Sequence, residues 1–163
     1  MQITFKSQPM TLAGRQLAVG DVLPDFVAAG PDLSPVHLGD TQGARLFLTV
    51  PSLDTPVCDR EALEVSRRVQ SMPLLTCYVV SMDLPFAQKR WCAAQDVANL
   101  VTLSDYKDRS FARATGTLIQ ELGLLTRAAF VVNADNLATY VEYVPEVTEH
   151  PDYAALLAAA QKA

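Results

Sequence analysis

The sequence predicts an α/β fold in which helices flank a central mixed β-sheet. Three continuous apolar runs, 46–50, 74–80 and 128–132, are typical of strands that are buried on both faces. A helix-like pattern comes after each of the first two runs, at 58–69 and 85–94, as parallel crossover connections require. The 163 residues are 50% hydrophobic and 19% charged, which is enough apolar material for one core.

The first 40 residues are rich in glycine and proline turn signals, with short strand candidates between them. Ile3 and Phe5 alternate with polar neighbours, and 9–12 can return as the second strand of a hairpin. We expect this hairpin, within residues 1–15, to be an addition to the main fold. Further short strands are expected at 25–29 and 36–38.

The rest of the chain alternates strands with helices. In the first helical pattern Ala62, Val65 and Val69 recur at spacings of three and four. Pro85 fits the first turn of the second helix. The remaining elements are a strand at 100–103, a short helix at 109–114 closed by Gly116, a hairpin of 128–132 with 137–143, and a helix at 151–161. This order predicts a thioredoxin-like fold over residues 1–163 as a single domain, with a sheet that is parallel at the crossovers and antiparallel at the hairpin.

Composition and charge exclude several classes of function. A net charge of −5 argues against binding to nucleic acid or to an anionic membrane surface. No run reaches the roughly 18 apolar residues of a membrane span. Residues 1–6 lack a secretory signal pattern, so we expect a cytoplasmic protein. Three cysteines do not make a disulfide scaffold, and a disulfide in a reducing compartment is typically transient and catalytic.

Cys58 is the most informative residue. The stretch Pro51-Ser52-Leu53-Asp54-Thr55-Pro56-Val57-Cys58 places it in the first turn of a helix that comes after a buried strand. Unpaired backbone N–H groups and the helix dipole favour a thiolate there. The alternative is a buried, inert cysteine at a helix start, because free cysteines are often buried.

The other two cysteines differ in how strongly the sequence indicates a functional role. Cys92 lies in the second helix, within Lys89-Arg90-Trp91-Cys92, and both helices could begin at the same end of the sheet. Whether Cys58 and Cys92 come within disulfide distance is left open by the sequence. Cys77 lies in a buried strand and is expected to be structural.

Other chemistries are disfavoured by spacing. The chain has no Cys-x-x-Cys dithiol, no Gly-x-Gly-x-x-Gly and no P-loop. His37 and His150 share no metal-ligand spacing with the cysteines, so we expect both at the surface and expect no metal or other cofactor.

Two segments resemble known motifs. Residues 51–58 resemble the Pro-x-x-x-Thr-x-x-Cys motif of peroxiredoxins, and Ser81-Met82-Asp83-Leu84-Pro85-Phe86-Ala87-Gln88-Lys89-Arg90-Trp91-Cys92 resembles the resolving-cysteine segment of bacterial thiol peroxidases, which are atypical two-cysteine peroxiredoxins. The similarity continues through 127–132 and 146–153 and covers nearly the whole chain.

The resemblance implies a role for each site residue. Cys58 corresponds to the peroxidatic cysteine and Cys92 to the resolving one, while Thr55, Arg127 and Pro51 match the remaining active-site positions. It further implies reduction of hydrogen peroxide and alkyl hydroperoxides through a sulfenic acid and a Cys58–Cys92 disulfide, recycling by thioredoxin, a homodimer, and a part in antioxidant defence and redox homeostasis.

The chemistry needs these residue types. Arg127 and the helix dipole would favour the thiolate, and the Arg127 fork would meet charge on the leaving oxygen. Thr55 could accept a hydrogen bond from the peroxide while donating one to the sulfur. Asp59 and Glu61 depart from the family pattern and make the first helical turn unusually charged. They favour a helix N-terminus but oppose a thiolate, so their net effect is open.

Two other functions remain as alternatives. A thiol–disulfide reductase on the same fold would reduce insulin without peroxide, although the missing Cys-x-x-Cys argues against it. A redox sensor would pass its oxidation to a partner protein through a mixed disulfide.

Overall fold

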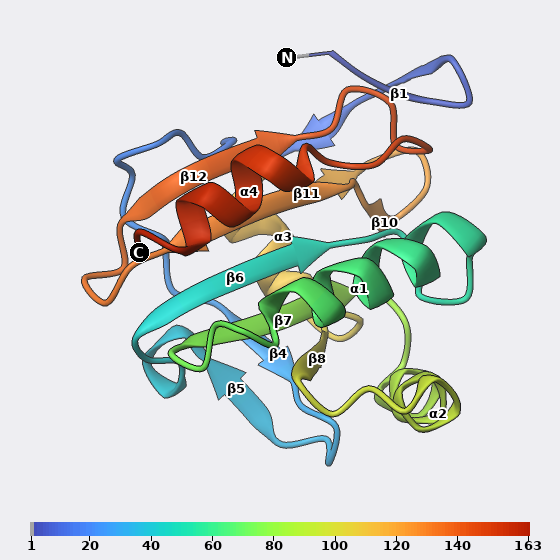
Figure 1. Cartoon of the computed structure of the whole chain (residues 1–163). Helices are drawn as coiled ribbons and strands as arrows, with labels where there is room; N and C mark the ends of the chain where they lie inside the picture. The colour runs from blue at the N-terminus through green and yellow to red at the C-terminus, as the bar shows by residue number, and fades with distance from the viewer. Residues whose placement is uncertain (1) are drawn as a thin grey trace.

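The computed structural model, which describes residues 2–163, is built around a seven-stranded mixed sheet (Figure 1). Its strand order is β12-β11-β6-β7-β8-β4-β5, with β6–β7 and β7–β8 parallel and the other pairs antiparallel. The strands are β4 (Val27–Ala29), β5 (Pro35–His37), β6 (Ala44–Thr49), β7 (Leu75–Ser81), β8 (Leu100–Ser104), β11 (Ala128–Val132) and β12 (Ala138–Tyr143). The helices are α1 (Pro56–Val69), α2 (Pro85–Gln95), α3 (Ser110–Thr115) and α4 (Tyr153–Ala160), with a 3-10 turn η1 at Leu38–Asp40. The predicted thioredoxin-like α/β class is therefore confirmed, and each predicted strand and helix is present within a few residues of its expected bounds.

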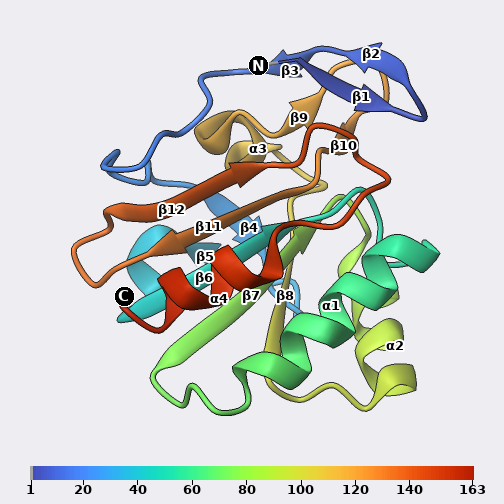
Figure 2. The same ribbon diagram turned by 45° about the horizontal axis from the view of Figure 1, so that its top comes forward.

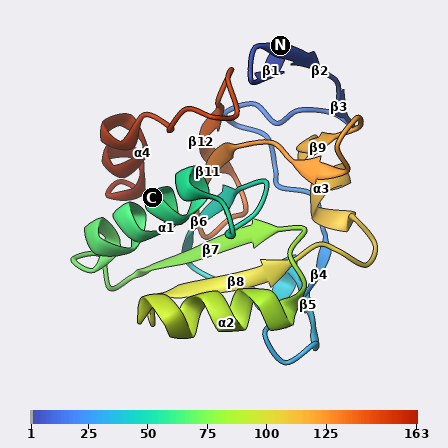
Figure 3. The same cartoon turned by 90° about the vertical axis from the view of Figure 1, so that its right-hand side faces the viewer.

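Hydrophobic cores lie on both faces of the sheet because successive strand residues point to opposite sides. On β6, Leu46 and Leu48 face the core that α1 and α4 cover, whereas Phe47 faces the core that contains Phe111 of α3. Figure 3 shows α1 and α4 on one side of the sheet and α3 on the other. Helix α2 packs against β8, next to α1.

The N-terminal segment forms a hairpin of β1 (Ile3–Phe5) and β2 (Gln8–Met10), as predicted. The next strand, β3 (Leu12–Ala13), leaves the hairpin and pairs with β9 (Leu118–Ile119), which pairs in turn with β10 (Leu124–Leu125). Figure 2 shows this small sheet beside the hairpin. Strands β3, β9 and β10 were not predicted, since two-residue strands leave no periodicity in a sequence.

The crossover connections decide where helices α1 and α2 begin. Strands β6 and β7 are parallel neighbours, so the loops after Thr49 and Ser81 leave the same edge of the sheet. Helices α1 and α2 therefore begin at one edge, as expected. Cys77 is buried in β7, and His37 and His150 are exposed, which confirms the predicted environment of each. Among residues 2–163, no helix has both the length and the apolarity that a bilayer span requires.

Candidate active site

The Cys58 side chain lies on the buried face of the first turn of α1 and is 1% exposed. Pro56 occupies the first turn, and the first intrahelical hydrogen bond runs from the Asp59 N–H to the Thr55 carbonyl at 2.9 Å. The amides of Val57 and Cys58 precede that bond and have no intrahelical acceptor. The sulfur therefore sits where the helix presents unpaired donors and positive potential.

Arg127, which directly precedes β11, brings a buried cation to this sulfur. Its Nη2 donates to the Cys58 Sγ at 3.3 Å, and its Nε donates to the Val147 carbonyl at 2.9 Å. The residue is only 1% exposed. The predicted partnership of Cys58 with Arg127, residues 69 positions apart in the sequence, is thus present in the fold.

Glu61 is the residue that the sequence reasoning missed. Its Oε2 accepts from Nη1 of Arg127, and the residue is fully buried rather than part of an exposed charged turn. Its Oε1 has no hydrogen-bond partner among the described residues. The guanidinium of Arg127 therefore donates to a carboxylate and to a sulfur at the same time. The negative charge of Glu61 offsets part of the positive potential at Cys58. The helical spacing in the sequence indicates this burial, because Glu61 is three residues after Cys58 and one before the inward-facing Ala62.

Thr55 and Pro51 lie in the turn before α1, and Thr55 is the N-cap residue of that helix. The Thr55 hydroxyl donates to the Ser52 carbonyl at 2.9 Å, so the expected hydrogen bond from Thr55 to the sulfur is not formed. That expectation was wrong because the hydroxyl has one proton and the turn already uses it. Its lone pairs remain able to accept. Pro51 is buried, and Asp83 fixes the turn by accepting from the Ser52 hydroxyl at 2.7 Å.

Cys92 is half-buried on α2 and is turned toward β8. Burial raises the pKa of its thiol, and a hydrogen bond with the Thr102 side chain partly offsets that effect. The three cysteines are free thiols. Burial also raises the pKa of Cys77 to about 12, so this residue stays protonated, as expected of a structural cysteine.

The two cysteines lie in different surroundings. The Cys58 sulfur accepts from Arg127, whereas Cys92 is on α2, the helix that packs against β8. Both are free thiols, so bonding Cys58 to Cys92 must take at least one sulfur out of its present contacts.

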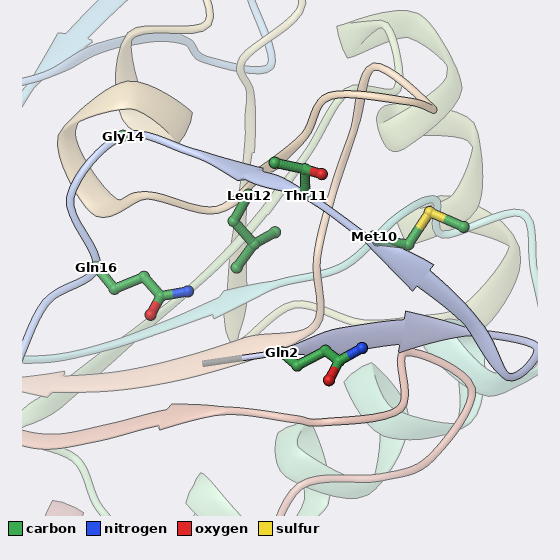
Figure 4. A pocket seen from close by; sticks show the side chains of 6 residues that line it. All are labelled: Gln2, Met10, Thr11, Leu12, Gly14 and Gln16. Atoms are coloured by element: carbon green, nitrogen blue, oxygen red, sulfur yellow. The ribbon is translucent and has the colours of Figure 1, made fainter.

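A cavity is lined by residues of the N-terminal segment and by none of the cysteines. It measures about 550 Å³ and is lined by Gln2, Met10, Thr11, Leu12, Gly14 and Gln16 (Figure 4). None of these residues is an Asp, Glu, His, Cys, Lys or Arg. Within residues 2–163, no group of three or more His, Cys, Asp and Glu side chains is arranged to hold a metal ion.

The fold and the cysteine site define the class of protein. A family model described as Redoxin matches residues 18–157, and the chain belongs to this family. The structure is similar to that of a peroxiredoxin-like protein from Aquifex aeolicus, with a TM-score of 0.92 and 37% identity over 99% of this chain and 96% of that one. A thiol peroxidase from Chromobacterium violaceum, 23% identical over the same shares of the two chains with a TM-score of 0.91, has the same fold.

Relatives with higher sequence identity indicate which subgroup of the family the chain resembles. The chain is 50% identical to the thiol peroxidase of Clostridium acetobutylicum, over 100% of this chain and 99% of the relative. It is 49% identical to the thiol peroxidase of Halalkalibacterium halodurans, over 99% and 98% of the two chains. The resemblance to bacterial thiol peroxidases that was based on the two cysteine motifs is confirmed.

Proposed function

We propose that this protein is a thiol-dependent peroxidase that reduces hydrogen peroxide and alkyl hydroperoxides to water and alcohols. One observation carries the proposal: the buried Cys58 sulfur lies 3.3 Å from Nη2 of Arg127, at the unpaired amides of a helix start. A cation and aligned N–H groups favour the nucleophilic form of a thiol.

In the first step the Cys58 thiolate attacks one peroxide oxygen and the O–O bond breaks. Cys58 is oxidised to a sulfenic acid, and the second oxygen leaves as alkoxide or hydroxide and takes up a proton. Arg127 and the amides of Val57 and Cys58 meet the charge on the leaving oxygen. The Thr55 hydroxyl accepts from the peroxide O–H, and Pro51 keeps water away from the sulfur.

In the second step Cys92 regenerates the enzyme. Its thiolate attacks the sulfenic sulfur, the S–O bond breaks, and hydroxide leaves with the Cys92 proton as water. Thioredoxin is the proposed dithiol that reduces the Cys58–Cys92 disulfide, and no metal or organic cofactor takes part. The sequence resemblance supports this reductant, a homodimer and a cytoplasmic antioxidant role.

We treat residues 1–163 as one domain to which the hairpin is an addition. Glu146 supports this view because it ties the hairpin to the segment that follows β12: its carboxylate accepts from the Thr4 hydroxyl at 2.8 Å and from the Lys6 and Ser7 amides at 3.0 Å each.

Serine substitutions at the two cysteines test the cycle. Cys58→Ser should abolish peroxide consumption, because the nucleophile is lost. Cys92→Ser should give one turnover and then over-oxidation of Cys58, measured by intact mass. Cys77→Ser is the matched control and should retain turnover with thioredoxin. Sustained turnover of Cys92→Ser with thioredoxin would contradict the resolving role.

A further inference from the structure

The one tryptophan of the chain joins the two helices that carry the proposed catalytic cysteines. Trp91 Nε1 donates to Asp59 Oδ1 at 2.8 Å. Trp91 directly precedes Cys92 on α2, and Asp59 is the residue directly after Cys58 on α1. Among the described residues, this is the only side-chain hydrogen bond between α1 and α2.

This bond ties the two helices directly, and the turns that precede them are tied separately by Asp83, which accepts from the Ser52 hydroxyl at 2.7 Å and from the Leu53 amide at 2.8 Å. A cavity of about 360 Å³ lies between the turn before α1 and helix α2, lined by Ser52, Leu53, Asp54, Asp83, Ala87, Arg90, Trp91, Ala94 and Gln95. The two segments are therefore not closely packed there. The Trp91 ring also packs against the core cluster that includes Cys58.

The bond must be considered together with the state of the sulfurs. Cys58 accepts from Arg127, Cys92 is half-buried on α2, which packs against β8, and both are free thiols. A disulfide between them must move the first turn of α1 or helix α2; Asp59 lies in that turn, and Trp91 lies in the second half of α2, directly before Cys92. Any such movement that separates Asp59 from Trp91 must break the bond.

Resting on the proposed function, we propose that Trp91 is a positioning residue that clasps α2 to the first turn of α1 and thereby slows disulfide formation. The clasp disfavours opening of the first turn of α1 after Cys58 has been oxidised, whereas the contact with Arg127 itself positions Cys58 for the attack on peroxide. The clasp also prolongs the lifetime of the sulfenic acid, on which a second peroxide can act: the sulfenate attacks a peroxide oxygen, the O–O bond breaks, and sulfinic acid and water or alcohol form. The clasp therefore sets the sensitivity of the enzyme to over-oxidation.

The type of bond sets the expected size of the effect. A hydrogen bond to a charged group stabilises by an amount that corresponds to at least roughly tenfold in an equilibrium constant. Trp91→Phe keeps the aromatic packing but removes the donor. We expect it to speed disulfide formation by about tenfold and to raise the peroxide concentration that over-oxidises half of Cys58 by a similar factor.

The experiment monitors one turnover of full-length reduced protein with hydrogen peroxide. Acid quenching, thiol alkylation and mass spectrometry report the disulfide and the sulfinic acid over time, and the initial loss of peroxide reports the first step. Trp91→Phe should leave the rate of the first step unchanged, whereas a general loss of structure would slow that step. Asp59→Asn is the matched control, because it removes the charge but keeps an oxygen that accepts from Trp91.

A double-mutant cycle separates the bond from packing. Asp59→Ala and Trp91→Phe should each speed disulfide formation, and the double variant should be no faster than either single one. Additive effects, or an unchanged rate in Trp91→Phe, overturn the clasp while the proposed function stands. If wild type forms no Cys58–Cys92 disulfide, both the proposed cycle and the clasp are wrong. Should Trp91→Phe fail to fold, the comparison of Asp59→Ala with Asp59→Asn decides, and equal rates in these two variants overturn the clasp.

Discussion

Replacing Glu61 by glutamine should destabilise this protein far more than replacing any exposed glutamate of α1. Glu61 is fully buried, and its ion-pair partner Arg127 has a side chain that is only 2% exposed. Removing one partner of a buried pair leaves the other charge uncompensated, at a cost of about 3 to 5 kcal/mol. Glutamine keeps the shape and one acceptor oxygen, so we expect the lower end, about 3 kcal/mol.

Glu64 provides a control on the same helix, one turn further along. It forms an i,i+4 ion pair with Arg68 at 2.6 Å, but the Arg68 and Glu64 side chains are 47% and 32% exposed. Exposed pairs of this kind contribute about 0.3 to 0.5 kcal/mol. Glu64→Gln should therefore shift stability by less than about 0.5 kcal/mol.

Urea unfolding under reducing conditions measures both variants, provided that the slope with denaturant is unchanged. Cys58→Ser extends the test, because with Glu61 neutral the Cys58 sulfur is the other group that can offset the Arg127 charge. The Cys58→Ser/Glu61→Gln variant should lose more stability than the sum of the single changes. If Glu61→Gln matches Glu64→Gln to within about 0.5 kcal/mol, Arg127 does not depend on Glu61, and our account of the buried charges is refuted.

Two predictions concern pH. Because burial raises the pKa of Cys92, and thiolate is the attacking form, disulfide formation after one equivalent of peroxide should keep accelerating up to at least about pH 8.5; rapid-quench mass spectrometry that found a plateau near neutrality would contradict this. The second prediction concerns Glu146. Desolvation acts to raise the pKa of its carboxyl, but hydrogen bonds from the Ser7 amide, Thr148 and Thr4 outweigh that effect and lower this pKa from 4.5 to about 2. This depressed pKa means that Glu146 stabilises the hairpin fully above about pH 4.5 and loses that effect as the pH falls toward 2. The protection of the amides of residues 3–10 against hydrogen exchange, taken relative to the intrinsic exchange rate at each pH, should fall over that range in wild type, whereas Glu146→Gln should show low protection throughout.

The large elements could be predicted because their signals are local. The apolar runs of β6, β7 and β11 are uninterrupted, as strands covered on both faces require. Pro56 and Pro85 mark the first turns of α1 and α2. Strands β9 and β10 depend instead on pairing with each other and with β3, which is over 100 residues away, and two residues carry no pattern.

The site was predictable in its cysteines and less so in its charges. Cys58 and Arg127 match motifs, and the fold brings them together. The local sequence indicates only a charged first turn at Glu61, because glutamate is rarely buried without a partner. Its partner is Arg127, 66 positions away, and no local pattern could join them. Helical spacing does place Glu61 on the same face as Cys58 and Val65, and because that face is the buried one, Glu61 is buried.

The fold places the two proposed cysteine roles on different helices. Cys58 accepts from Arg127 in the first turn of α1, while Cys92 is half-buried on α2, which packs against β8, and both are free thiols. On the proposed chemistry, the disulfide then competes with a second peroxide for the same sulfur. The outcome depends on the stability of one helical turn and its tie to Trp91, because global unfolding of a domain costs far more than such a local opening. Substitutions at Asp59 or Trp91 should therefore tune over-oxidation while Cys58 and Arg127 stay in place.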